Sequence, residues 1–340
     1  MTSAASPVLV DGLDRPLREV RISVTDRCNF RCTYCMPRSR FGPGHAFLPR
    51  SQIMTVAEII RLARILVRLG VRKVRLTGGE PLLRPDLEEI IEGICSAGAL
   101  DVALTSNGAL LAPRAQRLKD AGLHRLTVSL DTLDPQLHRG ISDSGVALQT
   151  VLSGLSAARA AGFGPIKLNA VIRRGLNVTS ILPLVEFARE HGDIMRFIEF
   201  MDVGESNGWK RSEVVGGAEI LAVIAARHPL EPIADGTVGQ VARRHRFLDG
   251  RGEIGVITSV TEPFCGGCTR LRLSADGRFH TCLFATAGND VLSLLRTGSD
   301  DAAIAAFISR LWVVRTDRYS EERATAERRD PRLEMSYIGG

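Results

Sequence analysis

The chain has 340 residues, of which 44% are hydrophobic and 24% charged, an ordinary globular composition that argues against a disordered polypeptide. Its net charge of +6 attracts phosphate, but no nucleic-acid motif accompanies it, so an anionic small molecule is favoured over a nucleic acid. Residues 1–18 lack a secretory signal pattern, and no apolar run reaches membrane-spanning length. We therefore expect a cytoplasmic protein with no membrane partner.

Strand-like segments alternate with helical periodicity from Glu19 to about Phe200, which predicts an α/β fold of successive βα units with a parallel sheet. Between the first two strands, apolar residues from Val56 to Val67 recur at helical spacing and predict a helix. A further helix is expected near Ala218–Arg227. The expected strands are Val20–Thr25, Lys73–Thr77, Val102–Ser106, Arg125–Asp131, Ile166–Ile172 and Met195–Met201.

Polar residues alternate with apolar ones along these strands, whereas buried parallel strands are usually apolar throughout. Successive side chains point to opposite faces, so one face of the sheet would carry hydroxyls and cations and would need an anionic ligand or water. The alternative is a set of exposed strands in an antiparallel sheet. The polar positions are Arg21, Ser23, Thr25, Arg75, Thr77, Ser129, Asp131, Lys167 and Asn169.

A first group of three cysteines, Cys28, Cys32 and Cys35, follows the first expected strand. In a reducing compartment such thiols are metal ligands or catalytic groups more often than disulfides. Three thiolates at this spacing can hold three corners of a [4Fe–4S] cube and leave the fourth iron open. A zinc knuckle is the alternative, although no fourth Cys or His lies nearby.

With Tyr34 before its last cysteine, this arrangement resembles the signature of the radical S-adenosylmethionine (SAM) superfamily. The resemblance implies a partial (βα)6 TIM-like barrel with a smaller C-terminal extension. It also implies that the open iron chelates SAM, whose cleavage yields a 5′-deoxyadenosyl radical that takes a hydrogen atom from the substrate. The segment Gly78-Gly79-Glu80, which follows the second expected strand, matches the part of the family that binds the methionine amine of SAM. Taken alone, this segment could equally form a simple turn. The expected SAM-binding residues are Tyr34, Gly78, Gly79, Glu80, Ser129 and Met201.

A second group of three cysteines, Cys265, Cys268 and Cys282, lies near the other end of the chain. Taken alone, it fits a second cluster with one open iron or a structural zinc site completed by Cys95 or His280. Beside the first group, a second [4Fe–4S] cluster is favoured. Cys95 remains outside both groups, in a helical stretch where a buried small hydrophobe is expected.

The order of motifs from Arg21 to the terminal Gly-Gly resembles the GTP 3′,8-cyclases of molybdenum cofactor biosynthesis. The chain departs from that family at Thr269, where Asn is more usual, and after Asn177, where the usual acidic residues are missing. The resemblance implies a lyase that abstracts the ribose C3′ hydrogen of GTP and forms (8S)-3′,8-cyclo-7,8-dihydroguanosine 5′-triphosphate. It also implies a reducing electron donor and transfer of the product to cyclic pyranopterin monophosphate synthase (MoaC), and it allows a homodimer.

The same resemblance assigns the substrate site. Residues expected to bind GTP are Arg21, Arg75, Thr105, Lys167, Arg270, Leu271 and Arg272. Residues expected to act in catalysis are Arg270, Arg272, Gly339 and Gly340.

Four segments are expected along the chain: an N-terminal segment at 1–18, the barrel at 19–235, an auxiliary-cluster extension at 236–319, and a charged, partly mobile tail at 320–340. Two other functions are weighed against the cyclase. One is a radical SAM peptide maturase with a single auxiliary cluster, and the other is a zinc-stapled nucleic-acid-binding protein.

Overall fold

The structure is a computed structural model that describes residues 8–234, 239–323 and 331–339. Six neighbouring parallel strands form its centre, and their order in the sheet follows the chain. The parallel pairing confirms the predicted α/β barrel and excludes exposed antiparallel strands as the cause of the polar alternation. These strands are β1 (Glu19–Ser23), β2 (Lys73–Thr77), β3 (Asp101–Ser106), β4 (Arg125–Ser129), β5 (Lys167–Ile172) and β6 (Ile194–Glu199).

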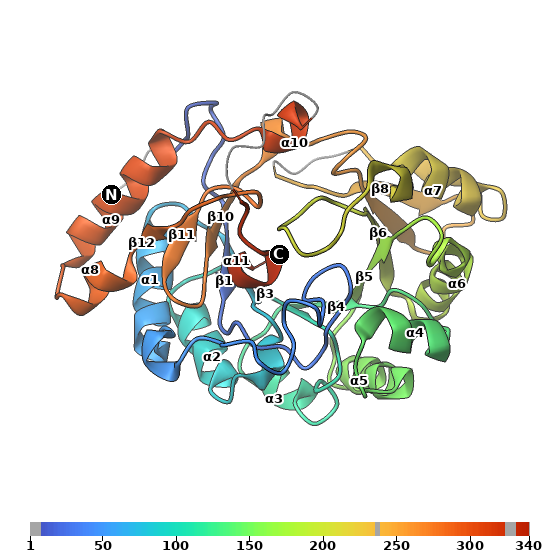
Figure 1. The fold of residues 1–340 in the computed structure, drawn as a ribbon, viewed down its shortest axis with the longest axis horizontal. Helices are drawn as coiled ribbons and strands as arrows, with labels where there is room; N and C mark the ends of the chain where they lie inside the picture. The colour runs from blue at the N-terminus through green and yellow to red at the C-terminus, as the bar shows by residue number, and fades with distance from the viewer. Residues whose placement is uncertain (1–7, 235–238, 324–330, 340) are drawn as a thin grey trace.

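Helices follow the strands and lie along the outer side of the arc that the strands form (Figure 1). Apolar side chains on the outer strand face, such as Val20, Ile22 and Val74, are completely buried beneath them. This apolar layer fixes the opposite, polar face toward the interior of the barrel. The helices are α1 (Val56–Arg68), α2 (Leu87–Ser96), α3 (Ala115–Asp120), α4 (Pro135–Ser142), α5 (Leu148–Ala160) and α6 (Ile181–His191).

Helix α1 begins where the sequence predicts, at a capping box in which Thr55 and Glu58 exchange side-chain to main-chain hydrogen bonds. The sequence predicts a buried face that contains Ile60 and Val67. The most deeply buried face of the helix is rotated from that one and includes Leu62 and Leu66. Ile60 is only half-buried, and it lies against Gly93 of α2. Helical spacing showed that α1 is amphipathic, but its two neighbours, a sheet and a helix, decide which residues are buried.

The C-terminal part of the chain lengthens the same sheet at both edges. On one edge, β10 (Arg270–Leu273) pairs in parallel with β1 and is followed by β11 (Arg278–His280) and β12 (Asn289–Asp290). On the other edge, β9 (Glu253–Ile257) pairs with β6 and carries β8 (Arg243–Phe247) and β7 (Leu230–Pro232). The extension is therefore continuous with the barrel sheet.

The remaining helices belong to this C-terminal part, and α7 corresponds to the helix expected near 218–227. No helix among the described residues is long and apolar enough to cross a membrane. The segment boundary expected at 235 falls outside the described residues and stays a prediction. These helices are α7 (Gly217–Ala225), α8 (Leu292–Arg296), α9 (Asp301–Val313), α10 (Tyr319–Glu322) and α11 (Met335–Ile338).

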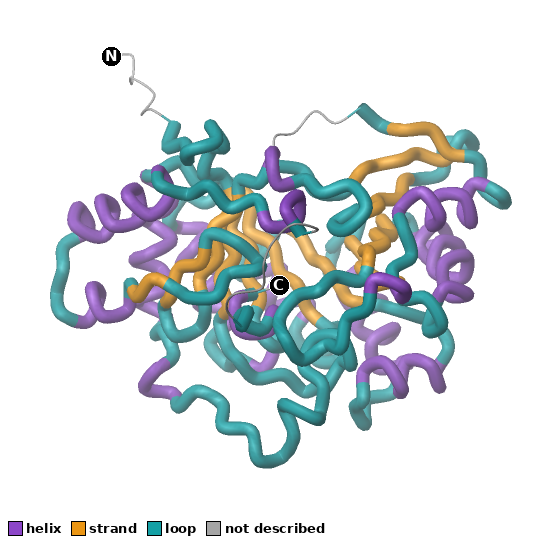
Figure 2. The backbone as a smooth tube through the Cα atoms, turned by 45° about the horizontal axis from the view of Figure 1, so that its top comes forward, coloured by secondary structure: helices purple, strands orange, loops and turns teal. Residues whose placement is uncertain are grey.

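The end of the chain lies over the middle of the barrel, where Figures 1 and 2 both place the C-terminus. Arg332 binds Asp202 at 2.8 Å, and the Tyr337 hydroxyl donates to Asp276 at 2.6 Å. The described part of the tail is thus docked on the barrel, whereas residues 324–330 and Gly340 lie outside the described residues.

Candidate active site

A cavity of about 310 Å³ opens in the barrel, and both cysteine groups line it. The first group lies in the loop after β1, and the second surrounds the start of β10, the strand paired with β1. All six thiols are free. The pairing of two strands about 250 positions apart in the chain therefore brings both groups to one pocket.

The three thiols of the first cysteine group are partly buried. Burial raises the pKa of the Cys28 thiol to about 11, and it also raises the pKa of Cys32 and Cys35. Cys28 Sγ accepts hydrogen bonds from the Phe30 amide at 3.4 Å and from Asn107 Nδ2 at 3.8 Å. Metal ligation by these thiols would therefore be coupled to the release of protons.

Two thiols of the second cysteine group have pKa values that are shifted in opposite directions. Burial raises the pKa of Cys282 to about 11. Burial acts in the same direction on Cys268, but Arg270 and Arg315 outweigh it and lower that pKa to about 6. Arg270 Nη2 lies 3.6 Å from Cys268 Sγ.

The donor sets suit clusters better than single ions. No three His, Cys, Asp or Glu side chains among the described residues gather around one ion-sized site. The partners that a structural zinc site would recruit, Cys95 and His280, do not line the cavity, and Cys95 contacts the Gly122 carbonyl at 3.4 Å. Three free thiols around a cavity, with no fourth ligand completing a tetrahedron in the part of the chain that the structure describes, fit a cube with an open corner.

The predicted SAM residues surround the first cysteine group. Tyr34 donates its hydroxyl to Asp131 at 2.8 Å, and burial raises the pKa of that carboxyl to about 6. Gly79 lies so close to the main chain of Arg27 that a Cβ would be 2.2 Å from its carbonyl oxygen. Gly78, Glu80, Ser129 and Met201 also line the cavity.

The Glu80 carboxylate is hydrogen-bonded to neighbouring segments of the protein. It accepts hydrogen bonds from the Ser106 hydroxyl at 2.8 Å, the Asn107 amide at 2.7 Å and the Leu82 amide at 3.0 Å. The side chain is 1% exposed, and burial raises its pKa to about 7 despite these donors. Glu80 therefore positions the loop that carries Asn107 next to Cys28.

Cations line the barrel face that the strand alternation predicted. Arg75 donates to the Thr105 hydroxyl at 3.0 Å, while its Nε and that of Arg270 are buried without a hydrogen-bond partner. Burial, followed by the repulsion of Arg272, lowers the pKa of Arg21. An anionic ligand would satisfy these donors and offset their mutual repulsion.

Glu19 stands among these cations as a carboxylate. Its oxygens lie 3.5 Å from Arg21 Nε, 3.6 Å from Arg75 Nε and 3.4 Å from Lys73 Nζ. Burial opposes its ionisation, but Lys73, Arg21, Arg75 and Arg270 outweigh burial and hold its pKa well below the usual range.

Most sequence-predicted GTP residues border this cavity: Arg21, Arg75, Thr105, Arg270 and Arg272. Lys167 begins β5 beside them without lining the cavity, and the Leu271 side chain lies in the apolar core. A contact of Leu271 with substrate would therefore have to come from its main chain. Gly339 reaches Arg272 through its carbonyl, and Gly340 lies outside the described residues. Their assignment to GTP binding and catalysis stays a prediction.

Sequence reasoning missed three residues of the site. Arg196 follows the same strand alternation and binds Asn169 Oδ1 at 2.9 Å, so that pattern could have identified it. Asn107 and Arg315 also line the cavity, but neither belongs to a local motif.

A curved parallel sheet with a CxxxCxxC loop after its first strand defines a radical SAM enzyme. The model of the "Radical SAM superfamily" matches residues 22–188, and that of "Molybdenum Cofactor Synthesis C" matches residues 194–321. SuiB of Streptococcus suis, solved with a precursor peptide, has a TM-score of 0.61 at 15% identity, with 92% of this chain and 67% of SuiB covered. This likeness shows the fold alone.

The chain belongs to the GTP 3′,8-cyclase family of the radical SAM superfamily. It is 52% identical to the GTP 3′,8-cyclase of Acidothermus cellulolyticus, over 97% of this chain and 98% of the relative. It is 44% identical to that of Staphylococcus saprophyticus (98% and 99% covered) and 47% identical to that of Xanthomonas campestris (99% and 98% covered). Membership of the superfamily implies a [4Fe–4S] cluster and SAM.

Proposed function

We propose that this protein is a GTP 3′,8-cyclase, a lyase that joins ribose C3′ of GTP to guanine C8 in the first step of molybdenum cofactor biosynthesis. The product is (8S)-3′,8-cyclo-7,8-dihydroguanosine 5′-triphosphate. One observation carries the proposal: two groups of three free cysteines face one cavity, with a cationic strand face beside them. The near full-length match to relatives of that name supports it.

The two cysteine groups have different roles in this proposal. Cys28, Cys32 and Cys35 hold the cluster that, when bound, supplies the electron for cleaving SAM to the radical that abstracts hydrogen. Tyr34, Gly78, Gly79, Glu80, Ser129 and Met201 shape the SAM site around it. Cys265, Cys268 and Cys282 hold a second [4Fe–4S] cluster, and its vacant corner would accept the guanine ring.

The cationic face binds the triphosphate and ribose. Arginine guanidinium groups are planar donors suited to phosphate oxygens, and Arg75 and Arg270 each have a buried Nε–H without a hydrogen-bond partner. Arg21, Arg75, Thr105 and Lys167 would hold the phosphates and ribose, with the main chain of Leu271 beside them. Arg270 and Arg272 would lie between substrate and second cluster, and Gly339 and Gly340 would assist catalysis.

The proposal also extends to partners. A radical SAM reaction consumes electrons, so an external reducing donor is required. The cyclised nucleotide would pass to MoaC in the cytoplasm. A homodimer is compatible with this proposal, and light scattering of the purified protein would measure the oligomeric state.

The direct test uses anaerobically reconstituted and chemically reduced protein with SAM and GTP. We expect 5′-deoxyadenosine together with a cyclised nucleotide, and we expect neither product from Cys28→Ala protein. Cys265→Ala protein should still cleave SAM but should not cyclise GTP. Cys95→Ala is the matched control, since this seventh cysteine lies on α2, outside the cavity lining.

Two results would overturn the proposal. The first is wild-type protein that holds iron and cleaves SAM but leaves GTP unchanged. The second is Cys265→Ala protein that cyclises GTP at the parental rate.

A further inference from the structure

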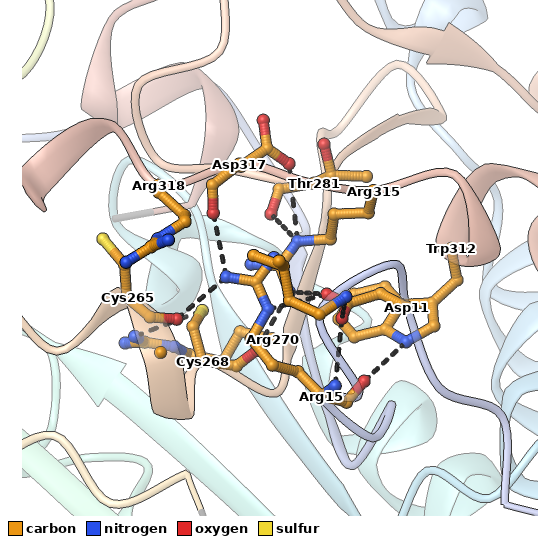
Figure 3. Close-up of polar contacts among 12 residues, drawn as sticks. Asp11, Arg15, Cys265, Cys268, Arg270, Thr281, Trp312, Arg315, Asp317 and Arg318 are labelled. Carbon is orange, nitrogen blue, oxygen red and sulfur yellow. Dashed lines mark hydrogen bonds and ion pairs between the residues drawn. The ribbon is translucent and has the colours of Figure 1, made fainter. Parts of the chain in front are cut away.

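A buried ion network lies behind the second cysteine group, formed by Asp11, Arg15 and Arg315 (Figure 3). Asp11 Oδ2 accepts from Arg15 Nε at 2.7 Å and from Arg315 Nη1 at 2.8 Å. The three side chains are at most 2% exposed. We name these three residues the Asp11 network.

The two arginines of the Asp11 network bind the main chain at two cysteines of the second group and at the residue before the third. Arg15 Nη1 donates to the Cys265 carbonyl at 2.8 Å, and Arg315 Nη1 donates to the Cys268 carbonyl at 2.9 Å. Arg315 Nε donates to the carbonyl of Thr281, the residue before Cys282, at 3.0 Å. One carboxylate thus links two guanidinium groups that hold every segment bearing a thiol of the second group.

The network also joins both ends of the described chain to this site. Arg15 and Asp11 precede β1, whereas Arg315 follows α9. The Trp312 indole donates to the Arg15 carbonyl at 3.1 Å, and the Arg315 guanidinium lies 4.6 Å from the Trp312 ring centre. The guanidinium groups are therefore held in place before any ligand arrives.

Stability alone does not account for such a network. Removing two cations and an anion from water is costly, and apolar residues of similar volume stabilise a core as well or better. Three other hydrogen bonds of the network instead go to carbonyls of ligand-bearing segments, and a fourth, from Arg15 Nη1, goes to the Asp317 carbonyl at 2.8 Å. These contacts fix the main chain from which the thiols project, as hydrogen bonds around metal ligands commonly do.

We propose that Asp11, Arg15 and Arg315 are positioning residues for the second cluster, which hold its three ligand segments and set the local charge. This inference rests on the second cluster of the proposed function. The two guanidinium groups and the Asp11 carboxylate, all buried, together carry one net positive charge beside three thiolates, and the partly exposed Asp317 carboxylate, 3.4 Å from Arg315 Nε, offsets part of it. Because reduction adds negative charge to a cluster, that positive charge favours the reduced form.

The first experiment isolates the second cluster in Cys28→Ser/Cys32→Ser/Cys35→Ser protein, where the parent should hold about four irons per chain. Arg315→Lys and Arg15→Lys keep the charge but lose the planar donor pattern. We expect cluster retention under a chelator to fall by about 10-fold or more in either variant. Arg310→Lys, at an exposed position of α9, is the matched control and should retain iron like the parent.

The second experiment measures the midpoint potential of the same cluster by electron paramagnetic resonance. Asp11→Asn removes a negative charge and should raise the potential, whereas Arg15→Gln removes a positive charge and should lower it. Opposite shifts from neighbouring residues would not result from general loosening of the fold.

A parallel series in Cys265→Ser/Cys268→Ser/Cys282→Ser protein controls for misfolding, and first-cluster iron should be unchanged there by the network substitutions. Equal loss of iron in both backgrounds, or parental retention and potential in every variant, would overturn the inference. If the parent without the first cysteine group binds no iron, the second cluster of the proposed function fails instead.

Discussion

The main-chain carbonyl of Gly339 accepts a hydrogen bond from Arg272 Nη1 at 2.6 Å. This contact connects the C-terminal segment to β10, the strand that follows Cys268. Gly339 has a φ of 71°, and a Cβ there would lie 3.1 Å from the Thr77 hydroxyl. Gly339→Ala would cost about 1 kcal/mol in backbone strain and would also displace the carbonyl. We expect GTP turnover to fall about 10-fold, as loss of a hydrogen bond to a charged group predicts.

The matched control for this change is Gly298→Ala. Gly298 has a φ of 83° but open space around its missing Cβ, so the substitution adds similar strain without a contact. Iron content and SAM cleavage without GTP should be unchanged in both variants. Equal turnover in the two variants would show that the Gly339 contact is dispensable.

Glu19→Gln removes a carboxylate from a group of cations. The ligand-free protein should lose about 3 kcal/mol in free energy of unfolding, because Arg21, Lys73 and Arg75 keep their charges without a counter-ion. Tripolyphosphate should restore more stability to this variant than to the parent, and GTP should bind it more tightly. Denaturant titrations with and without ligand measure both effects, and weaker GTP binding would contradict the prediction.

Lys167 should take up a proton when GTP binds near pH 8. Burial, together with the repulsion of Arg196, Arg125, Lys73 and Arg75, lowers its pKa to about 7, so much of the population is neutral in the empty barrel. A bound triphosphate would favour the charged form and raise that pKa, and GTP affinity should weaken as pH rises above about 7.

Calorimetry in buffers of different ionisation enthalpy measures this uptake. Lys167→Gln should reduce it, whereas Lys210→Gln, at an exposed position, should leave it unchanged. Uptake that is the same in the parent and the Lys167→Gln protein would assign the proton to another group.

Glu80→Gln should weaken SAM binding without a direct loss of a SAM contact. The amide nitrogen would face one of the donors from Leu82, Ser106 or Asn107, and a buried donor without an acceptor costs about 1–3 kcal/mol. The loop that brings Asn107 next to Cys28 would shift. The SAM-induced change in the spectrum of the first cluster should require higher SAM concentrations, and the exposed Glu92→Gln is the control.

The sequence alone was sufficient for features that depend on local pattern. Apolar periodicity predicted six successive βα units, and alternation along the strands predicted a polar interior face that carries Arg21, Arg75 and Asn169. The first cysteine group was recognisable because its members lie within one loop. Two strand ends differ from the prediction: β4 stops at Ser129 and β6 at Glu199. Beyond Ser129 the Leu130 amide still donates to the Asn169 carbonyl, but the Val171 amide donates to the Asp131 side chain in place of a main-chain carbonyl.

Only the tertiary structure decided which distant segments meet. Pairing of β10 with β1 brings the two cysteine groups to one cavity, and the Asp11 network assembles from opposite ends of the chain. The tertiary structure also showed that the Glu80 carboxylate binds the loop that carries Asn107 and that the Leu271 side chain faces the core. Periodicity reports that a side chain is buried or exposed, but its partner depends on strand pairing and packing between residues far apart in the chain.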